Sequence, residues 1–291
     1  MKVSTRADLF GDSSKNRVNY QKHGKVALLT LSDENLNGYT YKMFCDLDRS
    51  ILEARFDPEV EVIVITGDGE HFCAGANINM LEQADPTSKY YFCLHANETL
   101  SRLEQTPKLV IAAINGHCVG GGFEIALACD LRIARRAGGR LGLPEVNLGV
   151  LPGTGGTQRL TRLLGASKAL KLMVDGTTFS TEDAFQVGLV HDLVGETETK
   201  EIKGKAREVA ALSKEDFIAE VLTYAARYTS PNKASLAVGH IKRAVQTGGD
   251  LPLESGLAVE RELQAKLFAS ADAHEGLTAF VEKRKSEFRN Q

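Results

Sequence analysis

Short apolar runs, separated by longer amphipathic stretches, fill the first two thirds of the chain. The runs at 25–31, 60–66 and 109–114 have the length of strands and are rich in Val, Ile and Leu. The stretches at 41–54 and 88–103 place apolar residues at intervals of three and four, which is typical of helices. This alternation predicts an α/β fold in which helices cover a sheet.

The pattern changes after about residue 194, where the spacing of apolar residues becomes helical throughout. The expected helical segments lie at 204–213, 216–228, 232–245 and from 253 onward. We therefore predict an N-terminal extension at 1–17, an α/β core at 18–194 and a helical region at 195–291. The apolar faces of this region must pack on the core or on a neighbouring subunit.

Composition excludes several classes of function. The formal net charge of -3 leaves no basic excess for nucleic acid. The apolar runs are far too short to span a bilayer, and the N-terminus lacks the apolar core of a signal peptide, so we expect a cytoplasmic protein. The five cysteines form no CxxC motif and the histidines lack metal-ligand spacing, so no metal site is predicted.

Three glycine-rich turns stand out: DGEHFCAGANI, VGGGFE and LPGTGGTQR. Neither GxGxxG after the first strand nor GxxxxGK[ST] occurs, which argues against a nucleotide site. Such glycines either permit tight turns and close packing, or expose backbone N–H groups to a ligand. Because N–H groups at a helix N-terminus lack intrahelical partners, two turns of this kind can together form an oxyanion hole.

Two glutamates lie among apolar residues. Glu124 follows the triple glycine within one helical turn, and Glu145 follows Pro144 in a loop-like stretch. A buried carboxylate is costly unless it is neutralised, hydrogen-bonded or used in chemistry. Each glutamate is therefore either a surface or ion-pair residue, or one member of an acid–base pair. The arginines at 132, 140 and 159 are the candidate ion-pair partners.

Several ordered motifs together resemble those of a known family. HFCAGANI, NGHCVGGGFEIALACD and LGLPEVNLGVLPGTGGTQRL, with the C-terminal EG...AF.EKR pattern, are similar to the enoyl-CoA hydratase/isomerase family of the crotonase superfamily. The likeness runs from about residue 18 to 288. It implies a crotonase-type spiral of ββα units followed by a helical trimerisation region, assembled as a homotrimer or as a homohexamer made of two trimers.

The resemblance also implies an activity. Members bind acyl-CoA thioesters and stabilise a thioester enolate. By motif position, the oxyanion donors are the amides of Ala76 and Gly121, and Glu124 and Glu145 are the acid and base of a two-glutamate enoyl-CoA hydratase, a lyase of fatty acid metabolism. Coenzyme A is part of the substrate, so no further cofactor is expected, and neither nucleic acid nor membrane is an expected partner.

Other positions are implied to contact the substrate. They are Leu36, Ala74, Asn77, Ile78, Asn79, Gly120 and Lys283. Asn77 and Asn79 stand where many members have an acid and a CoA-contacting lysine, which leaves the contacts to the ADP end open. Lys283 either reaches the CoA phosphates of a neighbouring subunit or is a solvated helix charge. The aromatic stretch 89–95 either shapes the acyl pocket or packs in the core.

Three alternative functions remain. Some two-glutamate members also isomerise, so a Δ3,Δ2-enoyl-CoA isomerase is one, and a hydrolase-type acyl-CoA enzyme is another. The third is a non-catalytic protein of this fold that binds RNA or a protein partner, against which the balanced charge argues. Nothing in the sequence identifies the acyl group.

Overall fold

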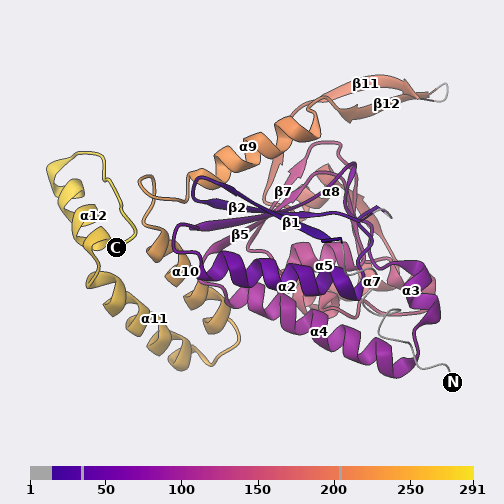
Figure 1. Ribbon diagram of the computed structural model, residues 1–291, viewed down its shortest axis with the longest axis horizontal. Helices are drawn as coiled ribbons and strands as arrows, with labels where there is room; N and C mark the ends of the chain where they lie inside the picture. The colour runs from indigo at the N-terminus through magenta and orange to yellow at the C-terminus, as the bar shows by residue number, and fades with distance from the viewer. Residues whose placement is uncertain (1–14, 34–35, 203–204) are drawn as a thin grey trace.

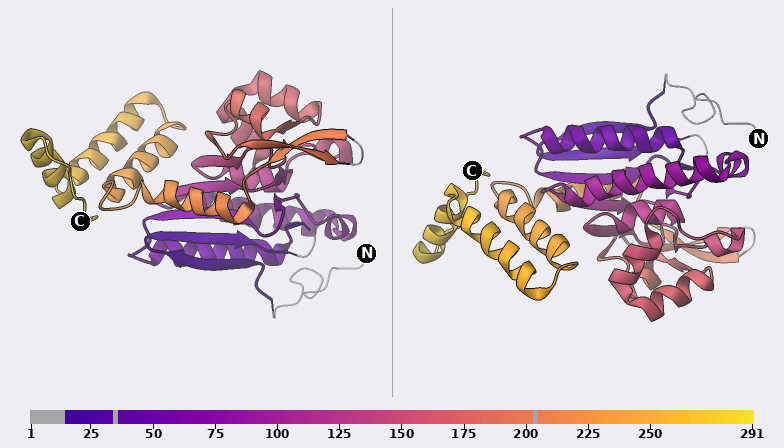
Figure 2. Two further views of the ribbon diagram at one scale, coloured as in Figure 1. Left: turned by 90° about the horizontal axis from the view of Figure 1, so that it is seen from above. Right: turned by 90° about the horizontal axis from the view of Figure 1, so that it is seen from below.

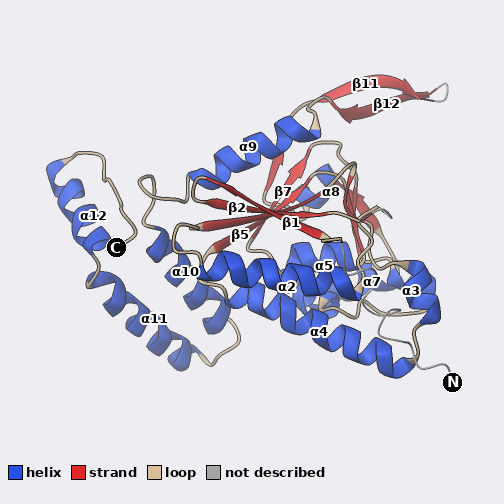
Figure 3. Ribbon diagram, in the orientation of Figure 1, coloured by secondary structure: helices blue, strands red, loops and turns tan. Residues whose placement is uncertain are grey.

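The structure is a computed structural model and describes residues 15–33, 36–202 and 205–291. Two β-sheets lie between helices, and a group of C-terminal helices extends from one end (Figures 1 and 3). Most of the extension predicted at 1–17 falls outside the described residues, and the first strand begins at Val18.

The larger sheet has the strand order β1-β2-β3-β5-β7-β10. The β1–β2 pair is antiparallel and the other neighbours are parallel. The apolar runs of the sequence form its three central strands, as predicted. The strands are β1 (Val18–His23), β2 (Val26–Leu31), β3 (Val62–Gly67), β5 (Leu109–Ile114), β7 (Leu131–Arg135) and β10 (Asp192–Val194).

Helices cover both faces of this sheet. Along β3, Val62 and Val64 belong to one hydrophobic cluster, whereas Ile63 and Ile65 belong to the other. Burial on both faces explains why residues 62–65 are apolar at consecutive positions rather than at alternate ones. Figure 2 shows α9 (Lys214–Ala226) across one face, with α2 (Tyr41–Phe56) and α4 (Pro86–Gln105) across the other.

A smaller sheet follows the order β4-β6-β8-β9. Each of its first three strands directly follows a strand of the larger sheet and precedes a helix, so the chain repeats a ββα unit. This repeat confirms the predicted spiral fold. The elements are β4 (His71–Cys73), α3 (Ile78–Gln83), β6 (His117–Val119), α5 (Gly121–Leu127), β8 (Arg140–Gly142), the 3-10 helix η1 (Glu145–Leu148) and β9 (Thr178–Ser180).

The remaining helices complete the core and form the C-terminal region. They are α6 (Gly156–Leu164), α7 (Ala166–Val174), α8 (Thr181–Gln186), α10 (Ser235–Gly248), α11 (Leu253–Phe268) and α12 (Ala271–Glu282). A buried ion pair of 2.8 Å between Lys242 and Asp130 fixes α10 to the core. In Figure 1, α11 and α12 extend to the left of the body. Within the described residues, no helix combines the length and apolar character that crossing a membrane requires.

One prediction for the C-terminal region is wrong. The segment 204–213 was expected to be helical, but β11 (Thr197–Ile202) and β12 (Lys205–Ala210) form an antiparallel hairpin that projects from the body (Figure 1). Ala, Arg and Glu favour a helix in isolation, but pairing with the Thr-containing β11 provides cross-strand hydrogen bonds that propensity does not count. The next helix, α9, begins only at Lys214, with Ser213 as its N-cap.

Candidate active site

A cavity of about 670 Å³ opens where the ends of β4 and β6 meet the loops around η1. Glu124 and Glu145 both line it, although 21 positions separate them in the sequence. The fold therefore places both glutamates at one cavity. From the sequence, only the family resemblance had predicted this. The other lining residues are Tyr39, Ala74, Gly75, Ala76, Ile78, Leu81, Glu82, Ala84, Asp85, Pro86, Lys89, Val119, Gly120, Gly121, Pro144, Asn147, Leu148, Val150, Leu151 and Gly153.

The N-terminus of α5 forms one wall of this cavity. Gly120 has a φ of 55°, in the left-handed region, and turns the chain from β6 into the helix. A Cβ atom on Gly121 would lie 1.7 Å from the ring of Tyr39, so only glycine fits there. As the first residue of α5, Gly121 has an N–H group without an intrahelical acceptor.

The loop after β4 lies against this helix start. Gly75 has a φ of 96°, and a Cβ atom on it would lie 3.2 Å from the carbonyl oxygen of Val119 and 3.8 Å from the nitrogen of Gly121. Two loops that are 45 residues apart in the sequence are thus in direct contact, and Ala76 and Gly121 both line the cavity.

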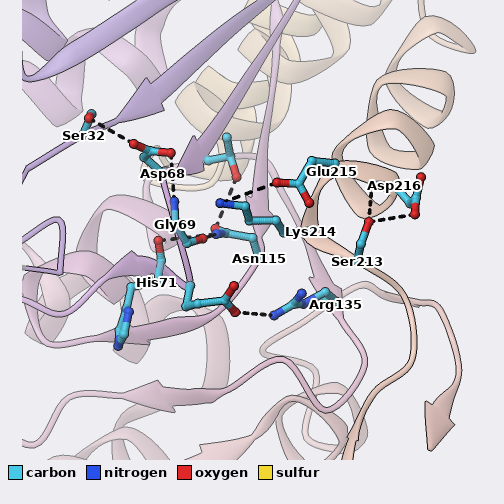
Figure 4. A network of polar contacts seen from close by, with 12 residues as sticks. Ser32, Asp68, Gly69, His71, Asn115, Arg135, Ser213, Lys214, Glu215 and Asp216 are labelled. Atoms are coloured by element: carbon cyan, nitrogen blue, oxygen red, sulfur yellow. Dashed lines mark hydrogen bonds and ion pairs between the residues drawn. The ribbon is translucent and has the colours of Figure 1, made fainter.

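Two asparagine side chains fix the backbone that leads into β4. The Asn115 amide donates to the carbonyl oxygen of Gly69 at 2.9 Å, as Figure 4 shows beside Asp68 and His71. The Asn37 amide donates to the carbonyl oxygens of Asp68 at 2.7 Å and of His71 at 2.8 Å. Both asparagines are buried, so these bonds are shielded from water and hold the loop before β4 in one position.

Glu124 is almost fully buried, with an exposed fraction of 1%. Its Oε1 accepts hydrogen bonds from the backbone N–H groups of Thr154 at 2.8 Å and Gly156 at 2.7 Å, and its Oε2 accepts one from the Thr154 hydroxyl. Burial raises the pKa of Glu124, and the hydrogen bonds from Thr154 and Gly156 oppose that rise.

Glu145 has a different environment. Its Oε2 is buried and has no hydrogen-bond partner among the described residues. Burial, followed by the negative charge of Glu124, raises the pKa of Glu145 to about 7. Gly120 lies close to this carboxyl group, because a Cβ atom on Gly120 would lie 3.1 Å from Oε1 of Glu145.

The three candidate arginines do not pair with these glutamates. Arg159 forms a 2.6 Å ion pair with Glu104. Arg132 donates to backbone carbonyl oxygens, and Arg140 donates to Thr178. Within the described chain, the ion-pair interpretation of Glu124 and Glu145 is therefore wrong.

The other residues expected at the site separate into two groups. Ala74, Ile78 and Gly120 line the cavity, whereas Leu36, Asn77, Asn79 and Lys283 do not. Asn77 instead caps α3 by accepting a hydrogen bond from the Met80 N–H at 3.2 Å. Lys283 ends α12, at the opposite end of the molecule from α3 in every view (Figures 1 and 2), so only another subunit could bring it to a cavity of this kind.

Only the first residue of the aromatic stretch 89–95 lines the cavity. Phe92 is buried and stacks on Tyr39 with 5.4 Å between ring centroids, while Tyr90 and Tyr91 are exposed. Core packing is therefore the correct interpretation for Phe92, whereas Lys89 lies at the cavity; Tyr39 and Thr154 were not predicted from the sequence. A usable signal existed for Thr154, because it is the one hydrogen-bonding side chain within the PGTGG turn.

Comparison with known proteins identifies the family. The model of the enoyl-CoA hydratase/isomerase family matches residues 21–291. The chain belongs to this family. Among its relatives is a short-chain enoyl-CoA hydratase of Clostridium acetobutylicum, 36% identical over 95% of this chain and 99% of the relative. Another is a crotonyl-CoA hydratase of Syntrophomonas wolfei, 33% identical over 92% of this chain and 96% of the relative.

Solved structures of the family agree with the fold. An enoyl-CoA hydratase structure from Geobacillus kaustophilus is 38% identical, has a TM-score of 0.85, and covers 96% of this chain and 98% of its own. DspI from Pseudomonas aeruginosa is 30% identical with a TM-score of 0.80, covering 96% of this chain and all of its own. The crotonase fold predicted from the motifs is thereby confirmed.

Proposed function

We propose that this member of the family is an enoyl-CoA hydratase, which adds water across the 2,3 double bond of an enoyl-CoA thioester. The observation that carries the proposal is the presence of Glu124 and Glu145 in one cavity with opposite hydrogen-bonding environments. The names of the relatives, which include short-chain enoyl-CoA, crotonyl-CoA and 2,3-dehydroadipyl-CoA hydratases, support the reaction class.

In this proposal, the N–H groups of Ala76 and Gly121 donate to the thioester oxygen. That oxygen gains negative charge when water attacks Cβ and the electrons move toward the carbonyl. Two fixed donors stabilise this charge more than the neutral ground state, and the loss of one such donor typically costs about a hundred- to a thousandfold in rate. The contact between the Gly75 loop and the start of α5 supports the pairing of the two amides.

The two glutamates then have separate roles. Three hydrogen bonds to Glu124 favour its ionised form, so it accepts a proton from the attacking water. With its pKa raised to about 7, Glu145 holds a proton near neutrality and delivers it to Cα. The hydroxyl group thus adds to Cβ and hydrogen to Cα.

The cycle closes when the proton moves back within the pair. After addition, Glu124 carries the proton from water and Glu145 is ionised, the reverse of the starting state. Because the charge of Glu124 raises the pKa of Glu145, one proton held by the pair is the favoured state near neutral pH. Exchange through a water molecule, after product leaves, restores the starting arrangement.

We also propose a cytoplasmic trimer or dimer of trimers. Apolar side chains on α11 and α12 support this assembly, since Leu253, Phe280 and Val281 are at least 74% exposed in the single chain. In such an assembly, Lys283 could approach the coenzyme A bound to a neighbour. Light scattering of the purified protein tests the proposal, and a monomeric mass at micromolar concentration would contradict it.

The hydratase proposal is tested with crotonyl-CoA, by following the loss of enoyl absorbance and the formation of 3-hydroxybutyryl-CoA. Glu124→Gln should lower kcat by about 10²- to 10⁴-fold, the usual contribution of one general base. Glu220→Gln is the matched control, because Glu220 is an exposed residue of α9, outside the cavity.

Two outcomes would contradict the proposal. If the folded protein binds CoA thioesters but hydrates no enoyl-CoA, hydration is not its reaction. If it moves a 3,4 double bond to the 2,3 position without adding water, the isomerase alternative replaces the hydratase.

A further inference from the structure

Lys89 is the one cationic side chain among the residues that line the cavity. It is located on the first turns of α4, half-buried, with Nζ 5.0 Å from the centroid of the Phe92 ring. The positive charge of Lys89 opposes the rise in the pKa of both Glu124 and Glu145, so it acts electrostatically on both carboxyl groups. An ammonium group in this position requires an explanation that the hydration chemistry does not provide.

No protein carboxylate neutralises this charge within the described residues, where Lys89 has no ion pair within 4.0 Å. Asp85 precedes it by four residues, a spacing that often forms a helical ion pair. The Asp85 carboxylate is instead used as the N-cap of α4, accepting from the N–H groups of Thr87 at 2.8 Å and Ser88 at 3.0 Å and from the Ser88 hydroxyl at 2.7 Å. Among the described residues, the ammonium group of Lys89 therefore contacts the Cys93 thiol and the Phe92 ring, but no carboxylate.

The surroundings of Lys89 suit a short carbon chain. Leu81, Leu148 and Leu151 line the same cavity and offer apolar surface to methylene groups. A ligand that places methylenes against these leucines and a carboxylate near the ammonium group would satisfy both. A purely hydrocarbon acyl chain would leave the lysine without a counter-charge on substrate binding, which is unfavourable as water leaves the cavity.

We propose that Lys89 binds a carboxylate at the distal end of the acyl chain, so that the preferred substrates are enoyl-CoA thioesters of dicarboxylic acids. This inference rests on the proposed hydratase function. It assigns Lys89 as a specificity-determining residue of the acyl pocket, acting at the end of the substrate opposite to the thioester.

The other carboxylates of the cavity do not prevent anion binding. Glu82 is exposed to solvent, and the carboxylates of Asp85 and Glu124 each accept three hydrogen bonds from the protein. Glu145 is protonated for much of the time near neutral pH because its pKa is about 7. An arriving carboxylate therefore meets Lys89 as the one cationic partner among the residues that line the cavity.

The experiment compares two enoyl-CoAs of equal length, 2,3-dehydroadipyl-CoA and 2-hexenoyl-CoA, which differ by a terminal carboxylate. The quantity measured is the ratio of their kcat/KM values. The wild-type protein should favour the dehydroadipyl thioester. Lys89→Met should lower the ratio roughly ten- to a hundredfold, the usual effect of losing a hydrogen bond to a charged group. Lys89→Arg, which keeps the charge, should retain most of the preference.

Lys168→Met is the matched control, because it removes the same charge from an exposed position on α7 outside the cavity, and its ratio should equal that of the wild type. A wild-type preference for 2-hexenoyl-CoA would overturn the inference without any variant. A Lys89→Met ratio equal to the wild-type ratio would also overturn it. If kcat/KM then falls by the same factor on both substrates, the lysine acts on the glutamates instead of on the substrate carboxylate. If the protein hydrates none of the three thioesters, crotonyl-CoA included, the proposed function itself is contradicted.

Discussion

The two walls of the cavity place the same type of side chain in opposite environments. On the wall formed by α5 and the turn after η1, Glu124 accepts three hydrogen bonds, two of them from backbone N–H groups. On the wall formed by η1, the Oε2 atom of Glu145 has no partner among the described residues. The difference teaches that hydrogen-bond donors can oppose the effect of burial on a carboxyl group, because they stabilise the ionised form of Glu124 while the Oε2 atom of Glu145 receives no such bond.

This asymmetry is built by the backbone. The donors to Glu124 come from the glycine-rich turn at 152–156, whose N–H groups are fixed before any ligand arrives. A Cβ atom on Gly156 would lie 3.0 Å from Oε1 of Glu124 and 2.9 Å from both Leu143 and Pro152, so the turn approaches the carboxylate more closely than a residue with a side chain would allow. Preorganised donors of this kind require no rearrangement during the reaction.

The largest expected effect comes from replacing each glutamate and measuring rate and stability together. Glu145→Gln should lower kcat by about 10²- to 10⁴-fold and leave folding stability at pH 7.5 unchanged or higher, because it removes a carboxyl group that is costly to ionise. Glu124→Gln should lower both, with a stability loss of about 1–3 kcal/mol, because a Gln NH₂ group would leave buried donors without an acceptor. Urea unfolding measures the difference, and equal stability of the two variants would contradict the asymmetry.

A smaller effect is expected when one donor is removed. Thr154→Val keeps the shape and the backbone N–H but loses the hydroxyl that donates to Glu124. The pKa of Glu124 should rise, which leaves less of the ionised base, and kcat should fall by about tenfold, as expected for one hydrogen bond to a charged group. Thr154→Ser, which restores the hydroxyl, should recover most of the activity. Unchanged kcat in Thr154→Val would show that the backbone donors suffice.

The smallest effect concerns pH. Because Glu145 must carry a proton to act as the acid, kcat should fall as pH rises through about 7.

The same carboxyl group also makes folding stability depend on pH. Its folded-state pKa lies above the ordinary value of 4.5, so its contribution to stability is complete below pH 4.5 and is lost as pH rises through about 7. Urea unfolding across this range should show a steeper decline for the wild type than for Glu145→Gln, and parallel curves would contradict the raised pKa.

Much of the fold follows from local sequence patterns. The apolar runs at 60–66 and 109–114 are unambiguous strands because both faces of the sheet are covered, so the consecutive positions 62–65 and 109–114 are all apolar. The β11–β12 hairpin was missed because its strands are exposed, and an exposed strand carries no burial pattern to distinguish it from a surface helix. Local propensity then favoured the wrong structure.

The site was predictable only where a motif encodes it. The turn glycines and the two glutamates can be recognised in the sequence, because a positive φ and a buried charge each restrict which residue type a position accepts. Lys89 and Tyr39 have no such marking, since a lysine at the start of a helix and an aromatic residue after a loop are ordinary features. Their positions depend on long-range packing between α4 and the loop before α2, which single-sequence patterns do not contain.

The β11–β12 hairpin is also a position where the chain can accept insertions or deletions. The N–H of Ala211 donates to the carbonyl oxygen of Glu196, so the chain leaves the body and returns to it at one point. A segment with adjacent ends can be lengthened, shortened or exchanged without moving the strands and helices on either side. Evolution could therefore attach new surface at this position independently of the selection that acts on the cavity.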